Sequence, residues 1–238
     1  MSTSLLPESV ESPLVPCDAR APLRVAASAA TGRAWASDLY LDLFERFLVV
    51  GLFSWLVVRL VAAYLNTGNV GALVLLPSEG LVVVFMVIRR TSRQMSRRPG
   101  EWLMALGATC APMLVAPGSG EGLIAVAGAG ATLWLMGLLV QLHAKLTLGR
   151  SMGLVPGHRG LRLRGPYRFV RHPMYAGYLL SHLGWLLLHP SLWNLGVFGC
   201  CYALQIPRLL MEERLLSLDA EYRDYQAQVR FRLIPGVF

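Results

Sequence analysis

Long apolar runs separated by short polar loops occupy the chain from about residue 44 onward. A helix needs roughly 17–25 mostly apolar residues to cross the hydrocarbon core of a bilayer. The pattern predicts six membrane-spanning helices, over residues 44–65, 70–88, 102–116, 123–142, 175–188 and 192–210. The third run is short, and we expect it to span by tilting or by snorkelling of its flanking residues. The fifth and sixth runs, joined by residues 189–191, form a C-terminal helical hairpin.

The basic residues gather in every second loop. Five arginines follow the second run, seven basic residues follow the fourth, and four arginines follow the sixth, whereas the three opposite loops contain no lysine or arginine. Basic loops tend to stay on the cytoplasmic side of a membrane. Six spans place every basic loop and both termini on that side, and five or seven spans would break the pattern.

The composition agrees with a membrane protein. Hydrophobic residues make up 55% of the 238 residues and charged residues 15%, whereas a soluble domain carries about 25% charged residues. This excludes a secreted disulfide scaffold, a disordered regulator and a soluble nucleic-acid binder. The net charge of +8 follows from the topology, so we expect no nucleic-acid partner. Arginine supplies 21 of the 22 basic residues, which is typical of a GC-rich genome and favours a bacterial inner membrane.

Three regions follow from these patterns. Residues 1–38 mix Ser, Ala and Pro without an apolar period and predict a disordered cytoplasmic tail. Residues 39–142 hold the N-terminal transmembrane helices, and residues 143–238 form a C-terminal core. The four cysteines show neither a C-x-x-C pair nor a spacing suited to zinc, so no metal site is expected.

Some polar and small residues lie inside the predicted spans. Arg59 and Glu79 either pair with one another or snorkel and pack separately, and both interpretations stay open. His182 is expected to be a hydrogen-bonded packing histidine. Residues 128–130, Gly-Ala-Gly, predict close helix packing, because a dinucleotide-binding loop would need a preceding strand and a third glycine.

The candidate chemistry begins in residues 148–175, LGRSMGLVPGHRGLRLRGPYRFVRHPMY. His172-Pro173 predicts a helix start, where the N–H that proline lacks would be unpaired in any case. A helix start attracts a carboxylate or phosphate, and Arg168 and Arg171 add positive charge. These residues alone predict an anion site at a membrane surface, which a lipid headgroup satisfies as well as a catalytic cofactor does.

A second cluster follows the sixth run. Pro207 is expected to kink the helix, and Arg208 and Glu212 lie four residues apart on one face. A solvated helix end with compensating charges is one interpretation of Glu212 and Glu213. The hairpin places this cluster beside His172, which favours a functional interpretation.

Together the two clusters resemble the isoprenylcysteine carboxyl methyltransferase family, whose superfamily includes phospholipid N-methyltransferases. The resemblance rests on G-P-Y-x-x-x-R-H-P-x-Y-x-G at residues 165–177, on Glu212-Glu213, and on Y-x-x-Y…R-x-I-P at residues 222–235. Residues 148–151, LGRS, are also similar to the family's lead-in. The resemblance covers roughly residues 140–238. The glycine that the family often carries before its terminal E-Y is absent here, which leaves the bend after the sixth span undefined.

The resemblance implies a membrane methyltransferase that uses S-adenosylmethionine, with a cytoplasmic cofactor pocket and a lipid or prenyl-type acceptor entering from the bilayer. It implies catalytic roles for Arg171 and Glu213. We add His143 as a catalytic candidate and Arg150 beside it, both to orient the headgroup of the acceptor. Alternatively, His143 takes a proton from an amine or thiol nucleophile, because histidine titrates near neutrality. A third interpretation, that both residues only mark the membrane boundary, stays open. The implied cofactor-binding residues are Tyr167, His172, Pro173, Tyr175, Gly177, Glu212 and Glu213.

Two other classes of protein remain open. A membrane reductase that uses NADPH, similar to the sterol reductases, shares the C-terminal hairpin, but its terminal motif includes Cys and Trp, which this chain lacks after the last span. A non-catalytic lipid-binding protein would use its arginine loops on anionic headgroups and would leave Glu212 and Glu213 unexplained.

Overall fold

The structure, a computed structural model of the chain, describes residues 21–92, 97–116, 124–155 and 163–238. Within these residues it contains seven α-helices, three short 3₁₀ helices and no strand, which confirms the predicted all-α fold. The α-helices are α1 (Ala21–Thr67), α2 (Val70–Ile88), α3 (Pro99–Cys110), α4 (Ile124–Leu148), α5 (Pro173–Leu188), α6 (Leu192–Leu216) and α7 (Ala220–Gln228). The 3₁₀ helices are η1 (Ala111–Leu114), η2 (Gly149–Ser151) and η3 (Gly165–Arg168).

The chain divides into two compact units, Met1–Ser37 and Asp38–Phe238. In the first unit, residues 21–37 are helical and form the start of α1, within the segment expected to be a tail. This stretch is rich in alanine, the residue with the highest helix propensity. Residues 1–20 lie outside the described residues, so a disordered tail there stays a prediction.

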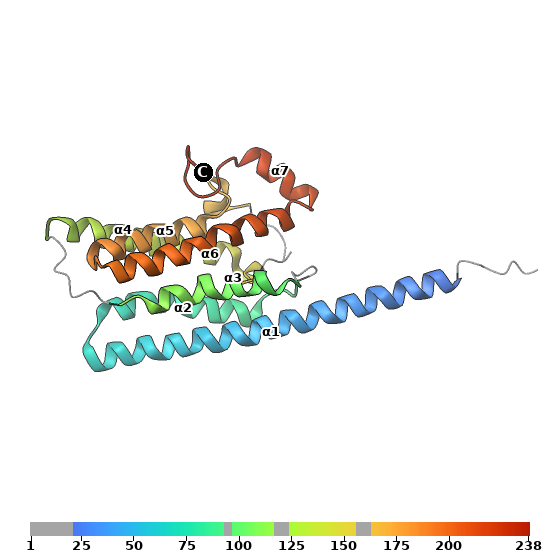
Figure 1. Cartoon of the computed structure of the whole chain (residues 1–238), viewed down its shortest axis with the longest axis horizontal. Helices are drawn as coiled ribbons and strands as arrows, with labels where there is room; N and C mark the ends of the chain where they lie inside the picture. The colour runs from blue at the N-terminus through green and yellow to red at the C-terminus, as the bar shows by residue number, and fades with distance from the viewer. Residues whose placement is uncertain (1–20, 93–96, 117–123, 156–162) are drawn as a thin grey trace, which may run out of the picture. The chain divides into compact units, whose positions relative to one another are not determined.

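The second unit is a bundle in which the helices lie alongside one another (Figure 1). α4 packs against α5 and α2, and α3 packs against α6. A buried apolar cluster joins α1, α2 and α3 to residues 152–155, and it consists of Val49, Phe53, Val82, Met86, Ala105, Met152, Leu154 and Val155. This cluster fixes the segment that follows η2 against the N-terminal helices.

Three helical segments among the described residues are long and apolar enough to cross a membrane: Ser37–Thr67, Val70–Ile88 and Val126–Ser151. They coincide with the first, second and fourth predicted spans. α3, α5 and α6 lie where the other three runs were predicted, but α3 has only 12 residues and changes to η1, whose second residue is Pro112. The structure therefore supports an integral membrane protein, and the number of six spans stays a prediction.

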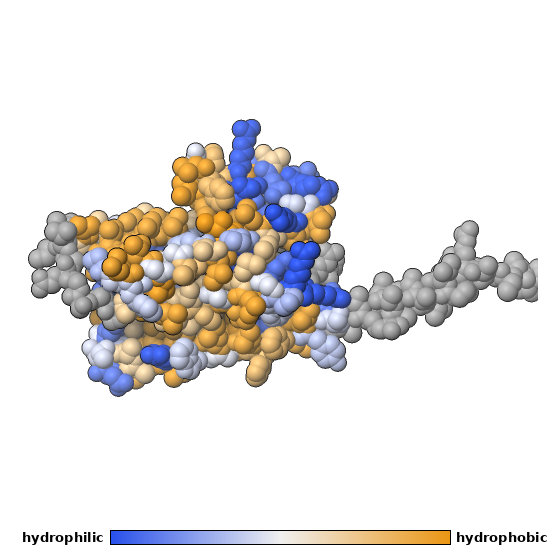
Figure 2. Space-filling view, in the orientation of Figure 1, coloured by the Kyte–Doolittle hydropathy of each residue, from blue (hydrophilic) through white to orange (hydrophobic). Residues whose placement is uncertain are grey.

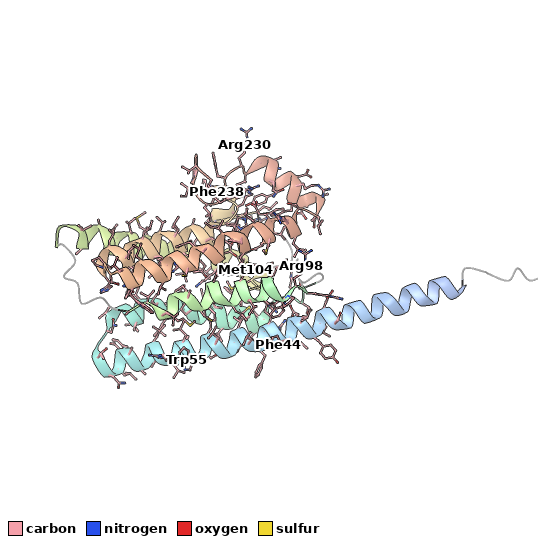
Figure 3. The ribbon with its side chains drawn as sticks, viewed as in Figure 1. Phe44, Trp55, Arg98, Met104, Arg230 and Phe238 are labelled. Atoms are coloured by element: carbon pink, nitrogen blue, oxygen red, sulfur yellow. The ribbon has the colours of Figure 1, made fainter. Side chains whose placement is uncertain are left out.

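The outer surface of the bundle is apolar. Figure 2 shows hydrophobic residues over much of the visible face, with hydrophilic residues gathered beside α7. Large apolar side chains are exposed along the helices, including Phe47 at 82% and Leu192 at 89%. Figure 3 labels Phe44 and Trp55 along α1, whereas Arg230 extends away from the C-terminal segment. Such a distribution suits a bundle surrounded by lipid with one polar end.

Small residues allow α4 and α5 to pack closely. A Cβ atom on Gly177 would lie 2.8 Å from the Gln141 nitrogen and 2.9 Å from the Gly137 carbonyl oxygen. One on Gly130 would lie 3.1 Å from the Gly184 carbonyl oxygen. The predicted packing role of residues 128–130 is thus confirmed at Gly130 and is wrong at Gly128, where a Cβ atom would meet nothing within 4 Å. α4 therefore holds α5, and with it the helix start at Pro173, in a fixed position.

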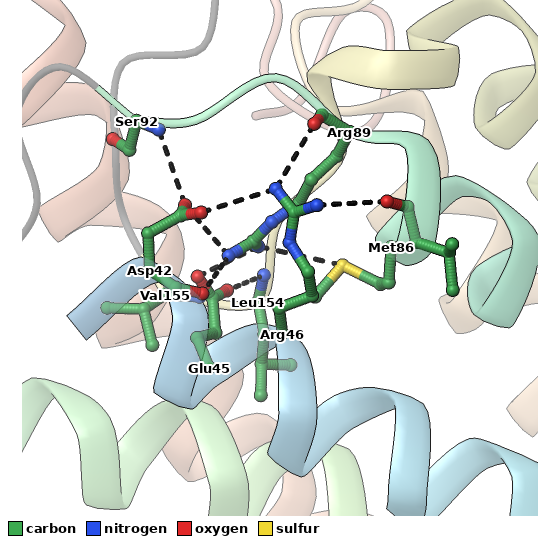
Figure 4. A network of polar contacts seen from close by, with 9 residues as sticks. Asp42, Glu45, Arg46, Met86, Arg89, Ser92, Leu154 and Val155 are labelled. Atoms are coloured by element: carbon green, nitrogen blue, oxygen red, sulfur yellow. Dashed lines mark hydrogen bonds and ion pairs between the residues drawn. The ribbon is translucent and has the colours of Figure 1, made fainter. Parts of the chain in front are cut away.

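A buried ionic network joins α1 to the end of α2 and to the segment after η2 (Figure 4). Arg89 donates to Asp42 Oδ1 at 2.8 Å and pairs with Glu45 Oε2 at 2.9 Å. Glu45 Oε1 also accepts the N–H groups of Leu154 and Val155, at 2.6 and 2.8 Å. Because these charges are buried and paired, removing one partner would leave the others uncompensated. The network fixes the position of Leu154, which the candidate site uses.

The polar residues inside the helices find specific partners. Glu79 pairs with Lys145 at 3.2 Å, whereas Arg59 is exposed and lies over the Trp55 ring. Of the two interpretations left open, separate packing of Arg59 and Glu79 is therefore the one observed. His182 shares a hydrogen bond of 2.9 Å with the Tyr202 hydroxyl, which confirms its packing role.

Candidate active site

The site begins at η3, where the chain turns toward α5. Gly165 has a φ of +61°, a conformation that a residue with a side chain rarely adopts. A Cβ atom there would lie 2.9 Å from Thr147 Oγ1 and 3.3 Å from His143 Nε2. The first glycine of the sequence motif is thus required both by its backbone conformation and by the close approach of α4. Tyr167, two residues later, is buried.

The start of α5 is joined to the C-terminal segment by two backbone hydrogen bonds. The N–H of Arg171 donates to the Phe231 carbonyl and that of His172 to the Arg232 carbonyl, each at 2.9 Å. Pro173 follows as the first helical residue and has no N–H. Both N–H groups precede the helix, so their pairing leaves the anion site expected at the first turn of α5 a prediction.

Glu213 is the centre of the charged cluster and is only 5% exposed. Its Oε1 lies 3.1 Å from His172 Nε2 and 3.0 Å from Arg171 Nε, and its Oε2 lies 2.7 Å from Arg232 Nε. The Arg171 contact is an ion pair without hydrogen-bond alignment, because Arg171 Nε has no hydrogen-bond partner among the described residues. Burial alone raises the pKa of Glu213, but hydrogen bonds from His172 and Arg232 and the charges of His172 and Arg171 lower it to about 2.

Glu212 makes a different contact from its neighbour. Its Oε2 accepts a hydrogen bond of 2.9 Å from the Tyr175 hydroxyl, and the residue is only partly buried. The Arg208 guanidinium lies over the Tyr175 ring, 5.6 Å from its centre. The two adjacent glutamates therefore face different groups. Glu213 is surrounded by cations, whereas Glu212 presents a carboxylate beside an aromatic wall.

The tyrosines of α7 complete the cluster. The Tyr225 hydroxyl donates to the Tyr167 carbonyl at 2.5 Å, which ties α7 to η3. The buried Tyr222 hydroxyl has no hydrogen-bond partner among the described residues. Burial, and then the charges of Glu213 and Glu212, raise the pKa of Tyr222. It is therefore a neutral hydroxyl at physiological pH that can donate a hydrogen bond to a further group.

Residues 126–219 match the family model of phospholipid methyltransferases. The match confirms the predicted resemblance to the integral-membrane methyltransferases, and it runs from α4 to the segment before α7. No curated protein matches the chain. The matched segment contains the motif at residues 165–177 and Glu212-Glu213, and ends before the motif at residues 222–235. The match supports a membrane methyltransferase.

Three of the predicted residues lie apart from Glu212 and Glu213. His143, on α4, is exposed and lies beside Gly165, and no contact among the described residues joins it to the Glu213 cluster. Arg150 donates to the Ile88 carbonyl at 2.8 Å and so anchors the end of α2. Gly177 faces α4. Of the predicted site residues in the phospholipid methyltransferase segment, the structure thus brings together Tyr167, Arg171, His172, Pro173, Tyr175, Glu212 and Glu213.

Two arginines belong to the site although neither was predicted as a site residue. Arg232 was named only as part of the terminal motif, yet it binds Glu213. Arg208 was placed on one face with Glu212, yet its guanidinium lies over Tyr175 and donates to the Leu154 carbonyl at 2.6 Å. The signal for Arg232 was its place in the R-x-I-P motif, but spacing alone does not show which carboxylate it meets.

A cavity of about 340 Å³ lies within the bundle. It is lined mostly by apolar residues of α1 to α6, and its lining includes Met174 next to the helix start and Arg208 on α6. Glu212 and Glu213 do not line it. Arg208 therefore connects the cavity to the motifs, because it lies over Tyr175, whose hydroxyl donates to Glu212.

Proposed function

We propose that the protein is a membrane methyltransferase that takes its methyl group from S-adenosylmethionine and transfers it to a lipid or lipid-linked acceptor. One observation carries the proposal. Two motifs about 40 residues apart meet in two specific contacts, His172 with Glu213 at 3.1 Å and Tyr175 with Glu212 at 2.9 Å. A solvated helix end would not need either contact.

The residues of the cluster fit the groups of the methyl donor, which has an ammonium, a carboxylate, ribose hydroxyls and a sulfonium. Glu212 has one carboxylate oxygen with no partner among the described residues, and it suits the ammonium or the ribose. The buried Tyr222 hydroxyl can donate a hydrogen bond to an oxygen or nitrogen atom of the methyl donor. Tyr167 and Tyr175 provide apolar ring surfaces for the remaining portion.

Glu213 takes a positioning role in this proposal, which modifies its predicted role as a catalytic residue. Both of its oxygens are occupied by His172, Arg171 and Arg232, so a ligand ammonium would have to displace one of them. Its function is to hold Arg171, Arg232 and the His172 ring together, and Arg171 would bind the carboxylate of the donor. Glu212 then becomes the glutamate that contacts the donor.

The reaction needs positioning more than acid–base chemistry. The donor, when bound, supplies an electrophilic methyl group on a sulfonium. Methyl transfer forms a bond from an acceptor lone pair to the methyl carbon and breaks the carbon–sulfur bond, whose electron pair stays on sulfur. A carboxylate or phosphate acceptor loses no proton in this exchange, and an amine loses one. The described residues contribute by orienting both groups and excluding water.

Calorimetry of the purified protein with S-adenosylhomocysteine tests the proposal. We expect binding to the wild type, no binding of NADPH, and affinity lowered about 10- to 150-fold in Glu212→Gln, because one charge-assisted hydrogen bond is lost. Glu221→Gln, which changes an exposed carboxylate of α7, is the matched control and should bind as the wild type does.

Each alternative class gives its own result in the same experiment. Binding of NADPH without S-adenosylhomocysteine would favour a reductase, and binding of neither would favour a non-catalytic lipid-binding protein. For the acceptor, labelled methyl donor is incubated with total membrane lipid or with a panel of soluble small molecules. Label found only in soluble products would contradict a lipid acceptor even if methyl transfer occurs.

A further inference from the structure

The cavity has a defined size and three charged lining residues, Glu79, Lys145 and Arg208. Its volume of about 340 Å³ corresponds to roughly eleven water molecules at about 30 Å³ each. Its lining is mostly apolar and comes from all six helices α1 to α6 and from Met152, Gly153 and Leu154. Roughly eleven carbon-sized atoms therefore fit inside, which is one short chain or the first part of a longer one.

Lys145 and Glu79 pair with one another, whereas Arg208, the third charged lining residue, lies over the motif residue Tyr175. Arg208 is only 6% exposed. Its Nη2 donates to the Leu154 carbonyl at 2.6 Å and its Nη1 to Gln205 Oε1 at 3.4 Å. Its Nε is buried and has no partner among the described residues. The guanidinium is thus held in place by neutral acceptors and keeps a donor unused.

Other buried or nearly buried cations in the described part of the chain each meet a carboxylate. Arg89 meets Asp42 and Glu45, Lys145 meets Glu79, and Arg171 meets Glu213. Arg208 has no ion pair with any described carboxylate. A guanidinium keeps its charge in proteins, and an unpaired buried charge is costly. The missing partner is therefore an anion.

We propose that Arg208 binds the carboxylate or phosphate of an amphiphile whose apolar part occupies the cavity. Arg208 lies over Tyr175, which donates to Glu212, so the anionic head lies beside the proposed donor site. In naming this amphiphile as the acceptor, the inference rests on the proposed function. The acceptor is then anionic, and only one short apolar segment of it lies inside the protein.

Three probes of equal chain length test the charge requirement: decyl phosphate, decanoate and decan-1-ol. Their apparent affinities are measured from the thermal stabilisation of the full chain in phosphatidylcholine nanodiscs over a concentration series. We expect the wild type to bind at least one of the two anions about 10- to 150-fold more tightly than decan-1-ol. Which anion is preferred identifies the head as a carboxylate or a phosphate.

Substitutions assign the preference to Arg208. Arg208→Gln should lose the preference for the anion and keep its affinity for decan-1-ol. Arg208→Lys keeps the charge but loses the forked guanidinium, so it should show an intermediate preference, and it serves as the second variant if Arg208→Gln fails to fold. Arg59→Gln, which changes an exposed arginine outside the cavity, should behave as the wild type.

Several results would overturn the inference. These are equal affinity of the wild type for all three probes, an unchanged preference in Arg208→Gln, or an unchanged preference in Arg208→Lys. Loss of S-adenosylhomocysteine binding in Arg208→Gln with the probe preference intact would assign Arg208 to the donor carboxylate instead. An anion preference in a wild type that does not bind S-adenosylhomocysteine supports the anion site and contradicts only the proposed function.

Discussion

Replacing Glu213 by glutamine tests how the charged cluster stabilises the protein. The pKa of Glu213 falls from 4.5 to about 2 in the folded protein, which corresponds to about 3 kcal/mol of stabilisation of its carboxylate form. The substitution also leaves Arg171, His172 and Arg232 without their shared partner. Breaking a buried ion pair costs about 3–5 kcal/mol of stability. We therefore expect Glu213→Gln to lower the free energy of unfolding by about 3 kcal/mol or slightly more at pH 7.

The same cluster predicts a pH dependence with a definite sign. Because the pKa of Glu213 is lowered by folding, its contribution is complete above about pH 4.5 and is lost as the pH falls toward 2. Between pH 6 and pH 3 the wild type should lose about 2 kcal/mol through this residue. Glu213→Gln has no such carboxyl group, so its loss over the same range should be smaller by about that amount.

Equilibrium unfolding in mixed micelles, followed by tryptophan fluorescence at pH 7, 6 and 3, measures both effects. Glu221→Gln, on the exposed side of α7, is the control and should follow the wild type at every pH. The reasoning is refuted if Glu213→Gln unfolds at pH 7 as the wild type does, or if both lose equal stability on acidification.

Three further predictions concern packing and topology. Gly177→Ala should destabilise the protein by about 1–3 kcal/mol in the same unfolding assay, because its Cβ would collide with α4, whereas Gly196→Ala, with nothing within 4 Å, should not. Tyr225→Phe should lower the free energy of unfolding by about 1–3 kcal/mol, because the Tyr167 carbonyl loses its hydrogen-bond donor. A stability equal to that of the wild type would show that water replaces the hydroxyl. Alkaline phosphatase inserted at residues 190–191 should be active and a C-terminal fluorescent fusion should fluoresce, and the opposite pattern would contradict the six-span topology.

The helices were largely predictable from apolar runs, but their ends were not. The second span was predicted over residues 70–88 and observed as Val70–Ile88. The sixth was predicted to end at residue 210, yet α6 continues to Leu216, because charged residues end an apolar run without ending a helix. The fourth was predicted to end at residue 142, whereas α4 includes Lys145, which is buried against Ser78 and Glu79.

The members of the site were more predictable than their partners. The motifs placed His172, Tyr175, Glu212 and Glu213 in one region, because the hairpin of α5 and α6 joins them. Sequence spacing carries no information about which cation meets which carboxylate across the fold. Glu79 could therefore not be assigned to Lys145, nor Glu213 to Arg232, before the packing of the helices was known.

The backbone bonds between residues 171–172 and 231–232 also bear on how the protein is made. Arg232 leaves the ribosome after all seven helices, and synthesis of the residues between α6 and Arg232 takes about a second or more. During that interval the newly inserted bundle carries Glu213 without one of its cations, and the N–H groups of Arg171 and His172, just before α5, lack their partners in the C-terminal segment. Helix insertion alone therefore does not complete the site. A quality-control protease that recognises an undocked C-terminal segment would remove chains in which this final step fails.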